Sequence, residues 1–90
     1  MKTIHLIISG KVQGVFFRAS AKKKAKDLNL TGWVKNTLAG NVEIIASGES
    51  EVLEKYIKWC HNGPDNARVE NVKINNREYY SFDTFEIIRN

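Results

Sequence analysis

The order of periodic segments along the chain predicts an α+β fold in which two helices cover one face of an antiparallel sheet. Several short segments have apolar residues at every second position, as strands with one buried face do. Two other segments have them at helical spacing. The resulting order is strand, helix, strand, strand, helix, strand, with a further strand expected at the end. This order is the split βαβ pattern of ferredoxin-like α/β sandwiches.

The first two elements are a strand and a basic helix. Residues 3–10 are predicted to form the strand, because their apolar side chains alternate with polar ones. Residues 18–29 are predicted to form the helix, with small and apolar residues on one side and lysines on the other. The buried positions expected here are Ile4, Leu6, Ile8, Phe17, Ala21, Ala25 and Leu28.

The remaining elements are a hairpin, a second helix and two more strands. Residues 31–37 and 42–48 form the hairpin, whose connection contains glycine and asparagine. Residues 50–61 form an amphipathic helix, and residues 67–75 and 82–88 supply the last strands. The buried positions expected here are Val42, Ile44, Ala46, Val52, Leu53, Tyr56, Ile57, Cys60, Val72, Ile74, Phe85 and Ile87.

Length and composition indicate one globular domain over residues 1–90, with 42% apolar residues and a net charge of +4. The chain has no apolar run long enough for a membrane span or a signal peptide, so a cytoplasmic location is expected. The one cysteine, Cys60, excludes an internal disulfide and is expected to be a buried thiol. The positive charge suits an anionic partner, but it does not indicate whether that partner is a phosphorylated small molecule or a nucleic acid.

The loop over residues 10–18 and the helix after it carry the clearest functional signal. Helix N-termini are electropositive and favour acidic side chains. This helix instead begins with Arg18, followed by the lysines of residues 22–24, and its one acid, Asp27, lies near the far end. A glycine-bearing loop that leads into a helix start with an arginine is suited to bind an anion. The lysines themselves are read as a solvated helical face, with weak steering of anions as the functional alternative.

The predicted topology gives Arg18 a partner on the second strand. Right-handed crossovers make the first and second strands parallel, with another strand between them. Their C-terminal ends therefore lie at the same edge of the sheet, about 10 Å apart. Asn36 and Thr37 stand at that edge, where the Asn36 carboxamide can orient a water or a substrate oxygen. Two readings of Thr37 are equally open: it holds the Asn36 side chain by a hydrogen bond, or it is a plain strand threonine.

The other candidate residues are explained by structural roles. His5 and His61 have no serine or carboxylate partner visible in the sequence and are read as structural. Phe16 and Phe17 are expected to be core or loop anchors rather than base-stacking platforms. The sequence lacks a Walker-type loop, paired histidines, a cysteine cluster and a Ser/His/Asp set. An enzyme built from these residues must therefore act by holding charge.

Two motifs resemble those of the acylphosphatase family. GKVQGVFFR over residues 10–18 resembles the family's first signature, and GWVKNT followed by GNVE over residues 32–43 resembles the second. The glycine–proline pair at 63–64 and the residues 67–69 fit as well, so the resemblance covers essentially the whole chain. It implies a ferredoxin-like fold and hydrolysis of acyl phosphates to a carboxylate and phosphate.

The resemblance also implies the site. The catalytic arginine and asparagine fall on Arg18 and Asn36, and a substrate-assisted mechanism without cofactor or metal is implied. The implied phosphate-binding loop comprises Gln13, Gly14, Val15, Phe16, Phe17 and Arg18, with Gly10 and Thr37 in supporting positions. The chain departs from the family pattern at Ala39, where an aspartate is common, and at Asn41, which puts the rigidity of the hairpin loop in question.

The expected partners follow from this assignment. They are a small acyl phosphate as substrate and inorganic phosphate or sulfate as competitors, with no membrane or nucleic-acid partner and a monomeric state. Two alternatives stay open. One is a ferredoxin-like module that binds nucleic acid through its basic helix. The other is a regulatory module fused to a larger enzyme, against which the unlinked chain of 90 residues counts.

Overall fold

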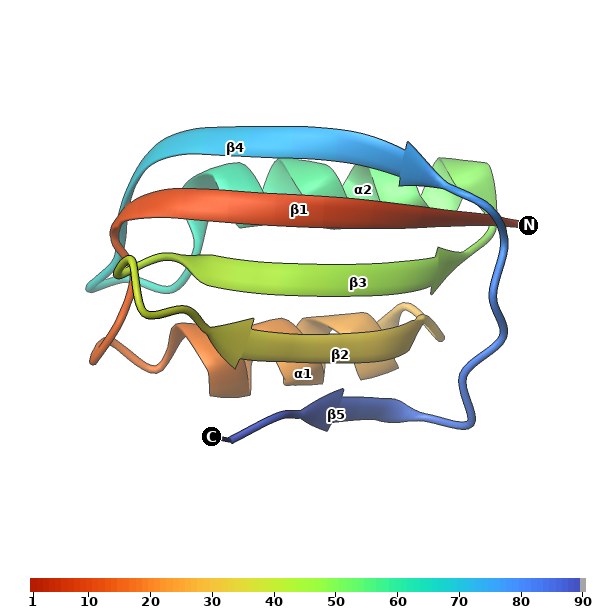
Figure 1. The fold of residues 1–90 in the computed structure, drawn as a ribbon, viewed down its shortest axis with the longest axis horizontal. Coiled ribbons are helices and arrows are strands. Elements are labelled where there is room, and N and C mark those ends of the chain that lie inside the picture. Colours follow the sequence, from red (N-terminus) through yellow and green to blue (C-terminus); the bar gives the residue numbers. More distant parts are fainter. Residues whose placement is uncertain (90) are drawn as a thin grey trace.

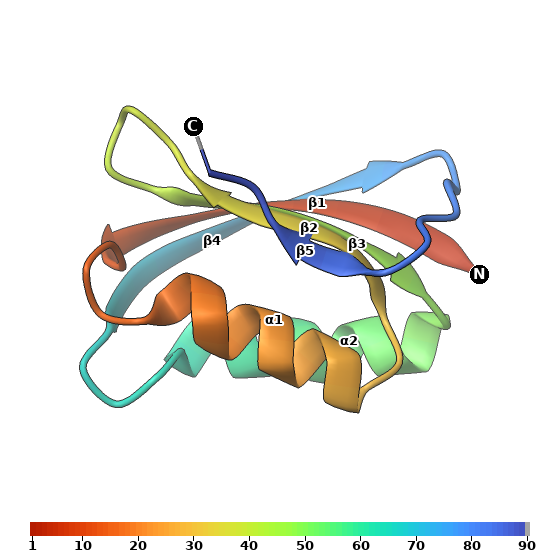
Figure 2. The same ribbon diagram turned by 90° about the horizontal axis from the view of Figure 1, so that it is seen from below.

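A five-stranded sheet with both helices on one face makes up the computed structural model, which describes residues 1–89 (Figures 1 and 2). The ferredoxin-like prediction is confirmed. The elements are β1 (Lys2–Lys11), α1 (Phe17–Asp27), β2 (Thr31–Asn36), β3 (Val42–Gly48), α2 (Ser50–Asn62), β4 (Arg68–Arg77) and β5 (Phe85–Ile87).

The sheet is mixed, because β5 pairs in parallel with β2. The strand order is β4-β1-β3-β2-β5, and the other neighbours pair antiparallel. The expectation of a wholly antiparallel sheet is therefore wrong at this edge. After β4 the chain passes along one end of the sheet, and β5 then runs back from that end in the direction of β2 (Figure 1).

This topology places three strand ends together. β1 and β2 both pair antiparallel with β3, so they are parallel to one another, as predicted. Since β5 is parallel to β2, its C-terminal end joins theirs at one end of the sheet. The loop that leads to α1 begins at the same end (Figure 1).

The core lies between the helices and the sheet, and most of the predicted positions are buried. Two expectations are wrong. Ile74 lies opposite Leu6 but on the edge strand β4, where it is 44% exposed. Phe16 is 78% exposed, whereas its neighbour Phe17 is buried. The buried core residues include Ile4, Leu6, Ile8, Phe17, Ala21, Ala25, Val42, Ile44, Ala46, Leu53, Tyr56, Cys60 and Phe85.

The two helices are joined through buried groups. The Tyr56 hydroxyl donates a 3.0 Å hydrogen bond to the carbonyl oxygen of Ala21, which satisfies a polar group in the core. Cys60 is fully buried, and this burial raises the pKa of its thiol well above the ordinary value. The prediction of a buried thiol is confirmed, and the raised pKa disfavours the reactive thiolate.

The charge of α1 is less inverted than the sequence suggested. The helix ends at Asp27, and the left-handed conformation of Asn29 (φ 59°) follows it. Lys24 and Lys26 therefore lie in its last turn, where cations are favourable. The unusual feature that remains is the first turn, which has no acidic residue and contains Arg18. Among residues 1–89, no helix is long and apolar enough to cross a membrane.

Candidate functional site

A hollow of about 320 Å³ lies at the end of the sheet where β1, β2 and β5 finish. We call it the first hollow. It is formed by the loop after β1, the start of α1, the end of β2 and the segment after β5. Its lining residues are Val12, Gly14, Phe16, Phe17, Arg18, Ala19, Asn36, Ile87 and Arg89.

Gly10 directs the chain from β1 into this loop. The register between β1 and β4 shifts between Ser9 and Gly10, as at a β-bulge. Gly10 has φ 122°, and a Cβ there would overlap the carbonyl oxygen of Arg68. Only glycine fits this close approach, so Gly10 supports the site through the backbone.

The loop enters α1 through left-handed residues. Gly14 has φ 74° and Phe16, the N-cap residue of α1, has φ 64°. No side chain caps the helix, and its first backbone bond runs from Ser20 N–H to the Phe16 carbonyl. The N–H groups of residues 17–19 precede that bond and have no acceptor within the helix. Such N–H groups, together with the positive end of the helix dipole, suit a bound anion.

Arg18 and Asn36 line the same hollow, which agrees with the topological expectation. Arg18 comes from the first turn of α1 and Asn36 is the last residue of β2. Both side chains are half-buried. The Oδ1 atom of Asn36 is buried, and none of the residues 1–89 gives it a hydrogen-bond partner. A buried acceptor without a partner is costly, and it is suited to a water or ligand that donates a proton.

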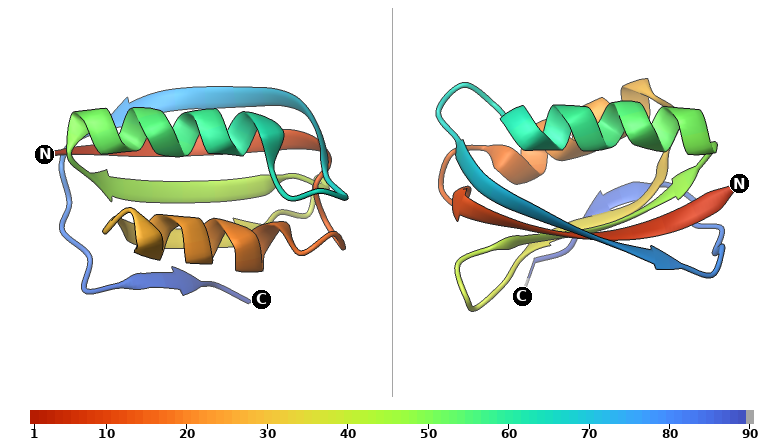
Figure 3. Two further views of the ribbon diagram at one scale, coloured as in Figure 1. Left: turned by 180° about the vertical axis from the view of Figure 1, so that it is seen from behind. Right: turned by 90° about the horizontal axis from the view of Figure 1, so that it is seen from above.

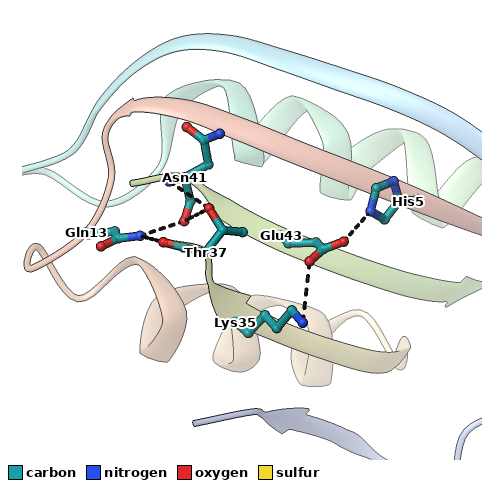
Figure 4. Close-up of polar contacts among 6 residues, drawn as sticks. All are labelled: His5, Gln13, Lys35, Thr37, Asn41 and Glu43. Carbon is teal, nitrogen blue, oxygen red and sulfur yellow. Dashed lines mark hydrogen bonds and ion pairs between the residues drawn. The ribbon is translucent and has the colours of Figure 1, made fainter. Parts of the chain in front are cut away.

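Gln13 and Thr37 do not line the first hollow. They take part in the bonds that join the loop after β1 to the hairpin between β2 and β3 (Figure 4). The Gln13 Nε2 atom donates to the carbonyl oxygens of Thr37 and Asn41, at 2.9 and 2.8 Å. The Thr37 hydroxyl accepts from the Asn41 N–H at 3.1 Å. Since the Asn36 Oδ1 atom has no partner among residues 1–89, Thr37 does not hold that atom, which was one of its two possible roles. The loop after β1 is thus tied to the hairpin between β2 and β3.

These bonds also hold the hairpin between β2 and β3 closed. They use the backbone of Asn41, and the Gly40 N–H adds a 3.2 Å bond to the Thr37 carbonyl. The hairpin is therefore closed by these bonds with Ala39 in its turn. Val15 is buried and, like Gln13, does not contribute to the lining, so its contribution to a phosphate cradle would come from its backbone.

A second hollow of about 410 Å³ adjoins the first, and the sequence did not reveal it. It shares Arg18, Asn36 and Arg89 with the first hollow and is completed by Thr37, Leu38 and Ile88. Arg89 was not among the predicted site residues. Its position follows from the parallel pairing of β5, which is extended by a 2.9 Å bond from the Ile88 N–H to the Val34 carbonyl. The direction of the last strand is the signal that could have identified it.

His5 has a partner that the sequence did not show, but it lies away from both hollows. Its Nε2 atom is 2.7 Å from a carboxylate oxygen of Glu43, and the Lys35 ammonium is 3.7 Å from the other oxygen (Figure 4). These residues lie on the sheet face opposite the core side chains Leu6 and Ile44. Within residues 1–89, no group of three His, Cys, Asp or Glu side chains is placed to hold a metal ion.

Comparison with known proteins gives a consistent result. The family model described as acylphosphatase matches residues 4–87. The chain is 54% identical over 68 residues to an acylphosphatase of Marinobacter nauticus, covering 76% of this chain and 74% of that one. It is also similar to the solved acylphosphatase of Coxiella burnetii, with 44% identity, a TM-score of 0.93 and coverage of 97% and 92% of the two chains. For the Bacillus subtilis acylphosphatase structure the corresponding values are 32%, 0.95, 99% and 100%.

Proposed function

This chain belongs to the acylphosphatase family, hydrolases that act on acid anhydrides, and we propose that Arg18 and Asn36 carry out the reaction in the first hollow. The observation that carries this assignment is the buried, unpartnered Oδ1 of Asn36 in the hollow that Arg18 also lines. Transfer of a phosphoryl group to water needs a cation to bind the phosphoryl oxygens and an acceptor to orient the water. Arg18 at the helix N-terminus and the Asn36 Oδ1 atom are suited to these two tasks.

Arg18 and the loop amides bind the phosphoryl group. The guanidinium offers several donors to the phosphoryl oxygens, and the free N–H groups of residues 17–19 supply more. The backbone N–H groups of residues 13–16 complete the proposed cradle. Because negative charge is redistributed over the phosphoryl oxygens as the bond breaks, these donors stabilise the transition state electrostatically.

Asn36 positions the attacking water. Its Oδ1 accepts a hydrogen bond from the water, and this bond directs the water oxygen toward phosphorus. A carboxamide is no base near neutral pH, so Asn36 orients the water without removing its proton.

The bond changes balance without a metal or a covalent intermediate. The water oxygen forms a bond to phosphorus while the bond between phosphorus and the acyl oxygen breaks. The electron pair of that bond leaves with the carboxylate, a weak base that needs no general acid. The water proton passes to a phosphoryl oxygen of the substrate itself. The products are a carboxylate and inorganic phosphate.

Phosphate release from benzoyl phosphate in the presence of EDTA tests the proposal. We expect Arg18→Ala and Asn36→Ala each to lower kcat/KM by about 10²–10³. Arg77→Ala is the matched control, since Arg77 is exposed at the C-terminal end of β4, away from both hollows. An inactive wild type, or full activity in both site variants, would overturn the mechanism. Inorganic phosphate and sulfate should compete with the substrate.

The remaining expectations stay proposals. We propose a monomer of one domain in the cytoplasm, with a small acyl phosphate as its ligand. Binding of nucleic acid through α1 is not favoured, because Lys23 pairs with Asp27 at 3.0 Å and Lys24 and Lys26 lie in the turn where cations stabilise the helix.

A further inference from the structure

The second hollow is continuous with the first through the residues that they share. Arg18, Asn36 and Arg89 line both hollows, whereas Leu38 and Ile88 line only the second. Leu38 is fully exposed and Ile88 is 37% exposed. Exposed apolar side chains beside a polar site indicate a surface that contacts an apolar group of a ligand.

We propose that the second hollow binds the acyl group of the substrate, with Leu38 and Ile88 contacting its apolar part and Arg89 contacting the departing carboxylate. This inference rests on the proposed function, which places the phosphoryl group in the first hollow. The acyl oxygen that leaves phosphorus then lies at the boundary of the two hollows. The three shared residues form that boundary.

The walls of this acyl subsite are held in place by backbone contacts. Leu38 belongs to the hairpin that Gln13 ties to the loop after β1. Ile88 continues β5, since its N–H bonds to the Val34 carbonyl at 2.9 Å. Both apolar side chains line the second hollow together with Asn36, so a ring or chain bound there would contact both.

Arg89 supplies a second cation where charge develops. When the bond to phosphorus breaks, its electron pair moves to the acyl oxygen, which gains negative charge. Arg18 lies in the first turn of α1, beside the amides of the proposed phosphate cradle, whereas Arg89 lines the same boundary from the segment after β5. The Arg89 guanidinium, which lines that boundary, stabilises the leaving carboxylate in the transition state.

Acyl selectivity tests the apolar wall. For Leu38→Ala we expect kcat/KM for benzoyl phosphate to fall about 3- to 10-fold while acetyl phosphate is nearly unaffected. The inhibition constant of inorganic phosphate should not change, since phosphate occupies the first hollow. Ile74→Ala is the matched control, because Ile74 is another exposed apolar residue, on β4. An unchanged ratio between the two substrates overturns the acyl subsite.

A series of ring-substituted benzoyl phosphates tests Arg89. In Arg89→Gln the rate should fall about 10-fold. The rate of the variant should also depend more steeply on the pKa of the departing carboxylic acid. A more basic carboxylate carries its developing negative charge less well, so it loses more when the guanidinium that stabilised this charge is removed. A merely structural role would lower all rates equally, and that result overturns the assignment. Arg77→Gln is the control. Failure of the proposed function is distinct, since wild type would then hydrolyse none of these substrates.

Discussion

The two helices start in opposite ways, although they pack side by side on one sheet. They run antiparallel, so their N-termini lie at opposite ends of the sheet (Figure 3). α2 follows an extended Glu49 and has Glu51 in its first turn, whereas α1 follows the left-handed Phe16 and has no acid in its first turn. Neither N-terminus has a side-chain cap.

This difference separates a structural helix end from a functional one. In α2 the carboxylates of the chain itself offset the positive end of the dipole. In α1 nothing in the first turn does so, and Arg18 adds to the positive potential. The uncompensated end of α1 faces the hollow that contains Asn36, where the phosphoryl group of a substrate can supply the missing negative charge.

Charge reversal should give the largest contrast. In Arg18→Glu we expect kcat/KM to fall more than about 10³-fold, because a carboxylate replaces the donor and repels the phosphoryl group. Glu51→Arg reverses the charge at the other helix and should leave the rate within about twofold. Steady-state hydrolysis of benzoyl phosphate measures both. A comparable loss in the two variants would show that the helix ends do not differ in function.

Phosphate should stabilise the protein only through α1. At about 100 times its dissociation constant, a ligand that binds only the folded state raises the free energy of unfolding by about 2.7 kcal/mol. We expect this gain in wild type and in Glu51→Gln, and most of it should disappear in Arg18→Gln. Urea unfolding with and without phosphate gives the three values. An equal gain in Arg18→Gln would remove Arg18 from the anion site.

The backbone at the entry to α1 should be less tolerant than that at α2. Gly14 is left-handed, with open space where a Cβ would lie, so Gly14→Ala adds backbone strain without a clash. We expect a loss of about 1–2 kcal/mol in the free energy of unfolding. Ser50→Ala, at the exposed start of α2, should stay within about 0.5 kcal/mol of wild type. Losses of the same size at both positions would contradict the contrast.

The smallest expected effect is on the free energy of unfolding, which should change in opposite directions when the charge is removed at the two helix starts. Removing the favourable charge in Glu51→Gln should lower the free energy of unfolding by about 0.3–1 kcal/mol. Removing the unfavourable charge in Arg18→Gln should raise it by a similar or smaller amount in anion-free buffer. Both effects should weaken as sodium chloride is added. Two changes of the same sign would show that the dipole does not determine the stability of these ends.

Sequence patterns were sufficient for most of the elements and for the juxtaposition of Arg18 and Asn36. Alternation and helical spacing located the first four strands and both helices, because each pattern reflects burial on one face. The handedness of crossovers then placed Arg18 and Asn36 at one sheet edge. That placement needed no side-chain detail, and the shared hollow agrees with it.

Features that depend on long-range geometry were missed. The direction of β5 is set by a segment that crosses the end of the sheet, and no local pattern encodes it. Arg89 was therefore overlooked. Local polarity also left the partner of Thr37 open, because only the tight turn brings the Asn41 N–H to its hydroxyl. Phe16 was expected to be an anchor, but its left-handed conformation turns it outward while Phe17 fills the core.

The position of β1 in the sheet has a consequence for how the chain folds. β1 lies between β3 and β4, and its pairs include Thr3 with Ser47 and Thr3 with Arg77. A nascent chain therefore cannot complete the sheet around its first strand until nearly all of the sequence has been synthesised. Closing such long loops is entropically costly before any contact compensates for it, which slows folding. Until then one edge of β1 stays unpaired, and an unpaired strand edge can pair with neighbouring chains.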